Sequence, residues 1–321
     1  MKVRLPQTLL GSGDDCAVLK LSAGTMLVSS CDSLIEGIHF ELPLTPFLKL
    51  GRKAISVNLS DIAAMGSIPK WLLISLAIPQ SIKLCDIEAL YKGMEQICKK
   101  YQIEVAGGDT VGSPEGFGLH ITILGETPKK RWFTRSAARP GDAIFVTGTL
   151  GDSALGLNIL KYGNRWKGSK KDKNYLIERH LNPTPRLEES RLLTNMANSM
   201  GAMIDISDGL LKDLGHICRA SGTGAELNEK LLPKSQPFES ISKKNSCSNL
   251  DLILSGGEDY ELLFTFRPQS VKKLMYQFQR AGKYLTQIGI ITGKKNRLVL
   301  TKSGGSPPVI CNPEGFDHFT R

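Results

Sequence analysis

Aspartates set in short stretches of glycine and other small residues are the feature of this sequence best suited to chemistry. The stretches lie far apart along the chain: Gly13-Asp14-Asp15, Ser30-Cys31-Asp32, Asn58-Leu59-Ser60-Asp61, Gly107-Gly108-Asp109-Thr110, Asp205-Ile206-Ser207-Asp208-Gly209 and Gly256-Gly257-Glu258-Asp259-Tyr260-Glu261. Carboxylates gathered at one site repel one another unless cations lie between them. All-oxygen ligand sets suit Mg²⁺, which is often bound together with phosphates. The pattern therefore predicts nucleotide-dependent phosphate chemistry.

Each stretch also has a plainer explanation. Gly13-Asp14-Asp15 could be a hairpin turn, and Asp32, followed by Glu36 and His39, could be surface polarity. Asp61 is harder to explain in this way, because its neighbours from Ile55 to Met65 are mostly small or apolar. A carboxylate on a buried helix needs a partner or a metal. This position therefore favours metal or phosphate chemistry.

Two further stretches have features that suit phosphate binding. The paired glycines before Asp109 would let backbone N–H groups approach a phosphate, although a glycine turn with a cap is the alternative. The stretch from Asp205 to Gly209 is predicted to start a helix, whose N-terminus attracts anions. An ordinary cap would explain only one of its polar residues. The sequence has no P-loop, no kinase signature and no GxSxG nucleophile motif.

Strands and helices alternate in the pattern that must position these residues. Strands are expected at 26–30, 71–78, 104–106, 119–125 and 143–147, and helices at 53–65, 86–101, 153–160, 188–200 and 208–220. The segment from Tyr162 to Asn174 is expected to be a loop, and 230–249 to be irregular. Turn residues from Ala137 to Asp142 suggest a boundary, because 321 residues usually form two domains. We expect domains at 1–137 and 138–321.

Composition restricts the class of protein. The apolar fraction is 41% and the charged fraction 22%, and no apolar run is long enough to span a membrane. The start of the chain lacks the apolar segment of a secretory signal, so we expect a cytoplasmic protein. Seven cysteines occur without CxxC spacing, which favours reduced thiols over zinc or disulfides. The net charge of +10 lies largely in lysine-rich stretches that are typical of solvated surface, so we predict no nucleic-acid partner.

In chain order, these motifs resemble the thiamine-monophosphate kinase family. The most specific stretches are Val57-Asn58-Leu59-Ser60-Asp61-Ile62-Ala63-Ala64-Met65-Gly66, Gly107-Gly108-Asp109-Thr110, Val146-Thr147-Gly148-Thr149-Leu150-Gly151-Asp152, Ile206-Ser207-Asp208-Gly209-Leu210 and Ser255-Gly256-Gly257-Glu258-Asp259-Tyr260-Glu261. The family is part of an ATP-binding superfamily with aminoimidazole ribonucleotide synthetase, selenophosphate synthetase and a hydrogenase maturation factor. Gly37-Ile38-His39-Phe40 and Gly315-Phe316-Asp317-His318-Phe319 favour the thiamine branch.

The resemblance implies an α+β fold with two domains. An N-terminal domain of α/β sandwich type would form a homodimer, and a C-terminal α+β domain would complete the active site. The implied reaction transfers a phosphoryl group from ATP to thiamine monophosphate, giving thiamine diphosphate. Several Mg²⁺ ions would assist direct in-line transfer.

The resemblance also assigns roles to residues of this sequence. The implied metal ligands are Asp15, Ser30, Cys31, Asp32, Asp61, Asp109, Asp205 and Asp208. The positions implied around ATP are Tyr91, Gly108, Asp109, Arg135 and Ser207, and those around thiamine monophosphate are His39, Glu258 and Phe316. Asp32, Asp61, Asp109 and Arg135 would form the catalytic group. Cys31 stands where the family usually has threonine, which is harmless only if this position binds metal through its backbone.

Three other functions compete with this one. A related superfamily enzyme could use the same ATP site on another substrate, although the segments around His39 and Phe316 argue against it. A nucleotide sensor would bind ATP without turnover. A basic nucleic-acid-binding protein would show strongly salt-dependent binding to DNA or RNA.

Overall fold

The computed structural model of the chain describes residues 3–12, 15–245, 249–302 and 307–316. Gly13, Asp14, Cys247 and residues 317–319 of the terminal motif lie outside the described residues. The chain divides into two compact units, one of Met1–Ala63 with Ser67–Trp132 and one of Ala64–Gly66 with Phe133–Arg321. The boundary expected between residues 137 and 138 lies beyond this junction and stays a prediction.

The first unit is built on a four-stranded sheet in the order β3-β6-β4-β5. Its strands are β3 (Thr25–Ile35), β6 (Gly118–Pro128), β4 (Ile68–Pro79) and β5 (Glu104–Ser113). Only β4 and β5 run parallel, and the other two pairs are antiparallel. A separate two-stranded sheet pairs β1 (Thr8–Leu10) with β2 (Val18–Leu19).

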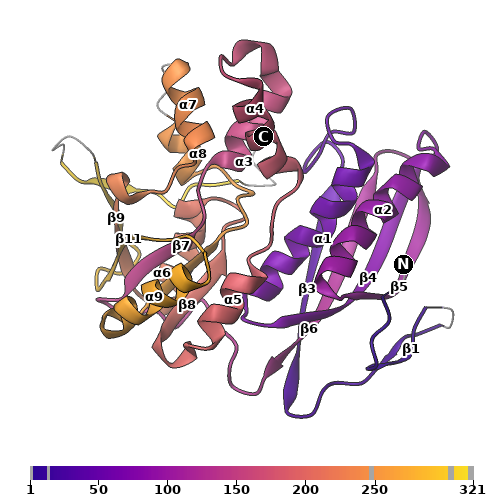
Figure 1. Cartoon of the computed structure of the whole chain (residues 1–321), viewed down its shortest axis with the longest axis horizontal. Coiled ribbons are helices and arrows are strands. Elements are labelled where there is room, and N and C mark those ends of the chain that lie inside the picture. Colours follow the sequence, from indigo (N-terminus) through magenta and orange to yellow (C-terminus); the bar gives the residue numbers. More distant parts are fainter. Residues whose placement is uncertain (1–2, 13–14, 246–248, 303–306, 317–321) are drawn as a thin grey trace. The chain divides into compact units, whose positions relative to one another are not determined.

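Two helices cover one face of this sheet (Figure 1). They are α1 (Phe47–Ala64) and α2 (Leu84–Tyr101). Their backbones approach closely at two glycines, because a Cβ at Gly51 would lie 2.0 Å from the Leu90 oxygen and one at Gly93 would lie 2.0 Å from the Leu48 oxygen. Gly66, with a φ of +69°, then allows the chain to leave α1 in the left-handed conformation that favours glycine.

The two faces of the sheet differ in their side chains, as the alternation of a strand requires. Leu72 and Ile74 of β4 and Ile121 of β6 are buried on the helix-covered face. Leu73 of β4 and Leu27 of β3 point to the opposite face, where they are 37% and 50% exposed. Within the described part of the first unit, that opposite face therefore carries exposed apolar side chains.

The second unit contains a seven-stranded sheet in the order β13-β12-β9-β11-β7-β10-β8. Its strands are β7 (Ala143–Thr147), β8 (Met200–Asp205), β9 (Gly224–Asn228), β10 (Leu262–Phe266), β11 (Leu285–Thr292), β12 (Leu298–Thr301) and β13 (Val309–Cys311). Its helices are α3 (Asp152–Tyr162), α4 (Lys170–Leu181), α5 (Leu187–Thr194), α6 (Leu210–Ser221), α7 (Gln236–Lys244), α8 (Leu250–Leu254) and α9 (Val271–Arg280).

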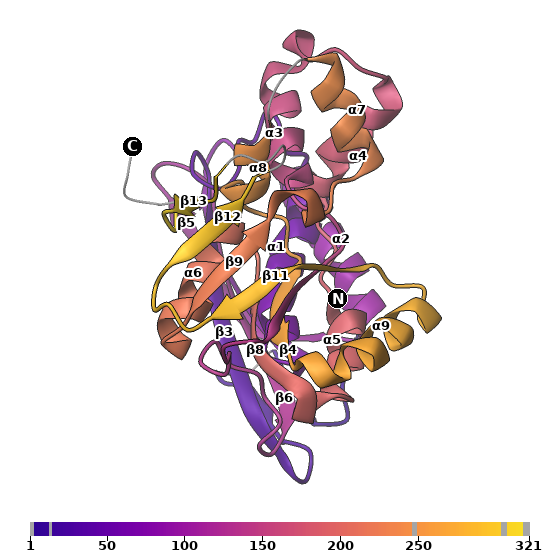
Figure 2. The ribbon, with the colours of Figure 1, turned by 90° about the vertical axis from the view of Figure 1, so that its left-hand side faces the viewer.

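Helices pack on both faces of this sheet, with α6 on one side and α5 and α9 on the other (Figure 2). The residues of β7, β8 and β10 are accordingly buried throughout. Ile144 and Val146 share one hydrophobic core with Leu214 of α6. Phe145 points the other way and stacks on Phe264 at 5.6 Å between ring centroids. The α+β class with two units is confirmed.

Most of the expected elements are present, but the polar segments hold more structure than their composition suggests. The stretch 162–174, expected to be a loop, contains the start of α4, where the Ser169 hydroxyl accepts a hydrogen bond from the Asp172 amide. The stretch 230–249, expected to be irregular, contains α7, which Ser235 caps. The helix expected at 188–200 ends instead at Thr194. None of the helices in the described ranges is long and apolar enough to cross a membrane.

Candidate active site

In the first unit, β3 and α1 bring two of the predicted carboxylates together. The Ser30 hydroxyl on β3 donates a hydrogen bond to Oδ2 of Asp61 on α1. Burial, together with the nearby Asp61 charge, raises the pKa of Asp32 to about 6. Two ionised carboxylates and a hydroxyl are oxygen donors of the kind that Mg²⁺ takes. The donor set therefore fits the predicted metal.

This pair predicts a specific pH dependence of stability. Asp32 has a folded pKa of about 6 against an ordinary value of 3.8, so the folded state holds more protons between these values. Its contribution to the free energy of unfolding is therefore full below pH 3.8 and is lost as the pH rises through 6. We expect Asp32→Asn to gain about 1–2 kcal/mol relative to wild type between pH 4 and pH 7 without Mg²⁺.

Urea unfolding of both proteins at the two pH values measures this difference. Subtracting the free energy of unfolding of the variant from that of wild type at each pH removes the contribution of the other titrating groups. A difference that is the same at both pH values would contradict the raised pKa of Asp32.

Cys31 does not share the face of its neighbours Ser30 and Asp32. Side chains alternate along β3, so Cys31 lies on the face opposite the helices, where it pairs in register with Thr122. A contact of Cys31 with a metal held by Asp32 and Asp61 would therefore use the backbone carbonyl. The replacement of threonine by cysteine leaves that carbonyl in place.

His39 lies in the turn that follows β3. The Ile35 amide donates a hydrogen bond of 3.0 Å to Nδ1 of His39, so the neutral ring carries its proton on Nε2. The turn is closed by a second backbone bond, from the Gly37 amide to the Phe40 carbonyl at 2.8 Å. These bonds fix the ring at the end of the strand that carries Asp32.

The predicted ATP residues of the first unit meet at β5 and α2. The expectation that Gly107 to Thr110 follow a strand was wrong, because these residues lie inside β5. Gly108 is required by close packing between strands, since a Cβ there would lie 1.9 Å from the Ile74 oxygen. A hydrogen bond to the Thr110 side chain joins Tyr91 of α2 to this strand, and burial, which outweighs that bond, raises the pKa of Tyr91.

Asp109 and Asp32 lie on opposite edges of the sheet. Asp32 pairs with Ile121, Ile121 with Ile74, and Ile74 with Gly108, the neighbour of Asp109. Three strand spacings separate the two edges, which amounts to about 14 Å. By register Asp109 also shares the open face of the sheet with Ser75. One copy of the chain therefore does not bring these two aspartates together.

Asp15 is exposed and lies between β1 and β2 in the sequence. Within the described ranges, no three His, Cys, Asp or Glu side chains are close enough to form a metal site by themselves. The predicted ligands therefore occur as smaller groups, of which Ser30, Asp32 and Asp61 are one.

In the second unit, the end of β8 and the loop that leads to α6 carry Asp205, Ser207 and Asp208. Asp205 is the last residue of β8 and is buried. The amides of Ser207, Asp208 and Gly209 all donate to Oδ2 of Asp213, at 3.1, 3.2 and 3.2 Å. The expectation that these amides are open to an anion was wrong, because Asp213 accepts from them. Burial and the charge of Asp208 raise the pKa of Asp213 to about 7.

The predicted substrate residues Glu258 and Phe316 are both attached to this loop. The Glu258 amide donates to the Ser207 carbonyl at 2.8 Å, and the Phe316 amide donates to the Asp208 carbonyl at 3.0 Å. Lys212 forms an ion pair with Asp208 at 2.8 Å and also donates to the Phe316 carbonyl. The structure thus brings the ATP position Ser207 together with both substrate positions.

Arg135 is exposed and lies near the C-terminal end of α6, far from the loop that carries Ser207. Its carbonyl accepts from the Ser221 hydroxyl at 2.8 Å. Burial first, and then the charge of Arg135, lowers the pKa of His216 on the same helix. The guanidinium is therefore close enough to α6 to affect a neighbouring imidazole.

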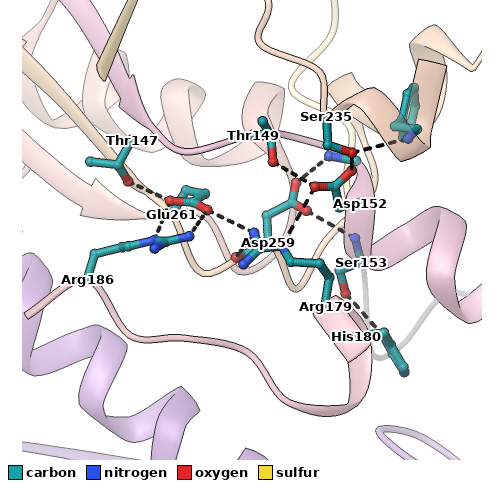
Figure 3. Close-up of polar contacts among 12 residues, drawn as sticks. Thr147, Thr149, Asp152, Ser153, Arg179, His180, Arg186, Ser235, Asp259 and Glu261 are labelled. Carbon is teal, nitrogen blue, oxygen red and sulfur yellow. Dashed lines mark hydrogen bonds and ion pairs between the residues drawn. The ribbon is translucent and has the colours of Figure 1, made fainter. Parts of the chain in front are cut away.

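A buried network of ion pairs and hydrogen bonds supports the segment that begins at Glu258 (Figure 3). Glu261 accepts from Arg179 at 2.8 Å, from Arg186 at 2.5 and 2.6 Å, and from Thr147 at 2.7 Å. Asp259 accepts from the Gly151 amide at 2.8 Å, and burial raises the pKa of Asp259 to about 8. The three carboxylates from Glu258 to Glu261 therefore differ in environment. Asp259 and Glu261 are buried and bind other parts of the protein, whereas Glu258 is partly exposed.

Sequence reasoning missed the residues that hold these loops. Asp213 lies in the first turn of α6, where an acidic residue is a common helix-start signal. Arg179 and His180 lie in α4, whose beginning had been expected to be a loop. Their contacts join segments about eighty residues apart, which no local pattern reveals.

Comparisons with known proteins place the whole chain among relatives. The model "AIR synthase related protein, N-terminal domain" matches residues 13–127, and the corresponding C-terminal domain model matches 139–301. A thiamine-monophosphate kinase of Escherichia coli K12 is 40% identical over 97% of this chain and 92% of its own length.

Two solved structures add to this likeness. Thiamine-monophosphate kinase from Stenotrophomonas maltophilia K279a superposes with a TM-score of 0.82 at 34% identity, covering 93% of this chain and 92% of its own. The structure described as AaThiL complexed with AMPPCP and TMP superposes with a TM-score of 0.78 at 34% identity, covering 99% and 93%.

Proposed function

This chain belongs to the thiamine-monophosphate kinase family, and from that premise we propose that it transfers the terminal phosphoryl group of ATP to thiamine monophosphate. The products are ADP and thiamine diphosphate. The observation that carries the proposal is the match of nearly the whole chain to a relative solved with AMPPCP and TMP. We further propose that the reaction takes place in the cytoplasm.

The acceptor explains why this site needs no general base. A phosphate oxygen of thiamine monophosphate is already ionised at neutral pH, so it can attack without losing a proton. The difficulty is to bring two polyanions together and to align them for in-line transfer. Bound Mg²⁺ would supply the positive charge that neutralises and orients both phosphates.

In this proposal, separate groups of residues bind the metal ions, ATP and thiamine monophosphate. Ser30, Asp32 and Asp61 hold metal on the first unit, with the Cys31 carbonyl beside them, and Asp15 is a further ligand. Asp205 and Asp208 hold metal on the second unit. Tyr91, Gly108, Asp109 and Ser207 contact ATP. Arg135 adds positive charge at the transferred group, as the guanidinium geometry suits phosphate. His39 donates from Nε2 to thiamine monophosphate, Phe316 stacks on its rings and Glu258 binds its polar or cationic atoms.

Product analysis tests this function directly. The purified protein is incubated with ATP, Mg²⁺ and thiamine monophosphate, with free thiamine in a parallel reaction. We expect ADP and thiamine diphosphate in equal amounts from the monophosphate and no product from thiamine. ATP binding without either product would reject the kinase reaction and leave a nucleotide-binding relative.

We also propose that the active enzyme is a homodimer. The family resemblance assigns Asp32 and Asp109 to one site, whereas a single sheet holds them about 14 Å apart on opposite edges. A second copy whose β5 lies beside β3 would bring its Asp109 to the strand next to Asp32.

Complementation between two inactive variants tests this arrangement. Asp32→Asn and Asp109→Asn, each inactive alone, are produced together with different affinity tags, and the mixed dimer is isolated. One of its two sites then has both aspartates, so we expect about half of the wild-type turnover. A mixed dimer as inactive as its parents would show that both residues come from one copy.

A further inference from the structure

We propose that His180 is a positioning residue for thiamine recognition, acting through the carboxylate of Glu258. This inference rests on the proposed function, in which Glu258 contacts thiamine monophosphate. His180 lies in the last turn of α4 and is 5% exposed at its side chain, whereas the side chain of Glu258 is 26% exposed. The pair therefore joins a buried ring to a carboxylate that reaches the surface.

The two side chains form an ion pair that is short enough for a hydrogen bond. Nδ1 of His180 lies 3.2 Å from Oε2 of Glu258. A ring protonated on Nδ1, whether neutral or cationic, donates to this carboxylate from a fixed direction. Because the imidazole is nearly enclosed, it has little freedom to move, and it transfers that restriction to the Glu258 side chain.

The backbone of Glu258 is restricted at the same point. Its φ is +63°, in the left-handed region that residues other than glycine rarely adopt. The bond from its amide to the Ser207 carbonyl holds this conformation. Backbone and side chain are thus fixed by separate partners, which is the arrangement a recognition carboxylate needs to meet one ligand orientation.

His180 has a second contact at the same nitrogen, so Ser153 and Glu258 share the Nδ1 position. Nδ1 lies 3.1 Å from the Ser153 hydroxyl, and the Ser153 amide donates to Asp259 at 3.4 Å (Figure 3). Arg179, the preceding residue, binds Glu261 at 2.8 Å. The end of α4 therefore contacts the motif at both Glu258 and Glu261. Only the Glu258 contact involves a partly exposed side chain, so only that contact is placed to affect a ligand.

Three substitutions at one position separate positioning from structural support. His180→Leu removes the donor. His180→Asn restores a donor, because the asparagine amide nitrogen occupies nearly the place of histidine Nδ1. His180→Gln places its amide nitrogen near Nε2 instead. KM for thiamine monophosphate, KM for ATP, kcat and the melting temperature are measured for each variant and for wild type.

We expect His180→Leu and His180→Gln to raise KM for thiamine monophosphate by about tenfold or more, with KM for ATP within about twofold. In His180→Asn, KM for thiamine monophosphate should be close to the wild-type value. Leu176→Val, one turn earlier in α4, is the matched control, because it lowers packing without touching the Nδ1 donor. It should lower the melting temperature and leave both KM values unchanged.

The outcomes distinguish this inference from the reaction on which it rests. Wild-type protein that makes no thiamine diphosphate overturns the function and the inference together. Active wild-type protein whose KM for thiamine monophosphate is unaffected by His180→Leu overturns the inference alone. Equal increases in KM for both substrates, or no recovery in His180→Asn, assign His180 a structural role and likewise overturn it.

Discussion

Asp61→Ala is expected to reduce kcat at least about a thousandfold while leaving the protein folded. In the proposed site Asp61 holds metal beside Asp32, so its loss removes positive charge from the place where two phosphates must meet. The substitution should not destabilise the metal-free protein. The charge of Asp61 contributes to the raised pKa of Asp32, and its removal relieves that repulsion.

Steady-state kinetics over a wide range of Mg²⁺ concentrations, together with thermal unfolding without Mg²⁺, test both parts of this expectation. Glu88→Ala is the matched control, because it also removes a carboxylate from the first unit but from an exposed position on α2. Glu88→Ala should retain normal kinetics. Normal turnover in Asp61→Ala would remove the metal assignment, and an unfolded variant would instead show that Asp61 supports the fold.

Glu261→Gln is expected to give the largest loss of stability, about 3–5 kcal/mol in the free energy of unfolding. The Glu261 carboxylate is fully buried and accepts from Arg179 and Arg186. Burial tends to lower the pKa of Arg186, and the charge of Glu261 reverses that effect. A neutral amide in its place would leave two largely buried guanidinium groups without their main counter-charge.

Glu188→Gln provides the comparison within the same unit. Glu188 pairs with Lys283 at 2.5 Å, but its side chain is 67% exposed. Exposed ion pairs contribute about 0–1 kcal/mol, so the same chemical change there should be nearly neutral. Urea unfolding followed by circular dichroism compares the two variants. Similar midpoints would mean that burial of the Glu261 network adds no stability.

Much of the fold could be predicted from sequence, because apolar periodicity reports local structure. The expected strand at 143–147 matches β7, and the expected helix at 86–101 lies within α2. Periodicity failed where polar residues form structure through capping, as at Ser169 and Ser235. It also gave no sign of β9, β11 or β12, which are defined by pairing with strands that are distant in the sequence.

The candidate site could likewise be predicted from sequence only in part. Motifs identified Ser207, Asp208 and Glu258, which the structure brings to one loop. Sequence did not show that the helix-start amides are already used by Asp213, because that depends on a side chain folding back over its own helix. It also did not show that Asp109 and Asp32 lie on different edges, because strand order is a property of the whole sheet.

The glycine contacts between α1 and α2 have a consequence for protein engineering. Any side chain at Gly51 or Gly93 would collide with the backbone of the other helix, and a backbone atom cannot be trimmed by a second substitution. Neighbouring changes therefore offer no stepwise route to accommodate a larger residue at either position. Libraries that vary Tyr91, proposed to contact ATP, or Asp61, proposed to bind metal, should keep both glycines constant. Diversity is better placed on the exposed residues of α2.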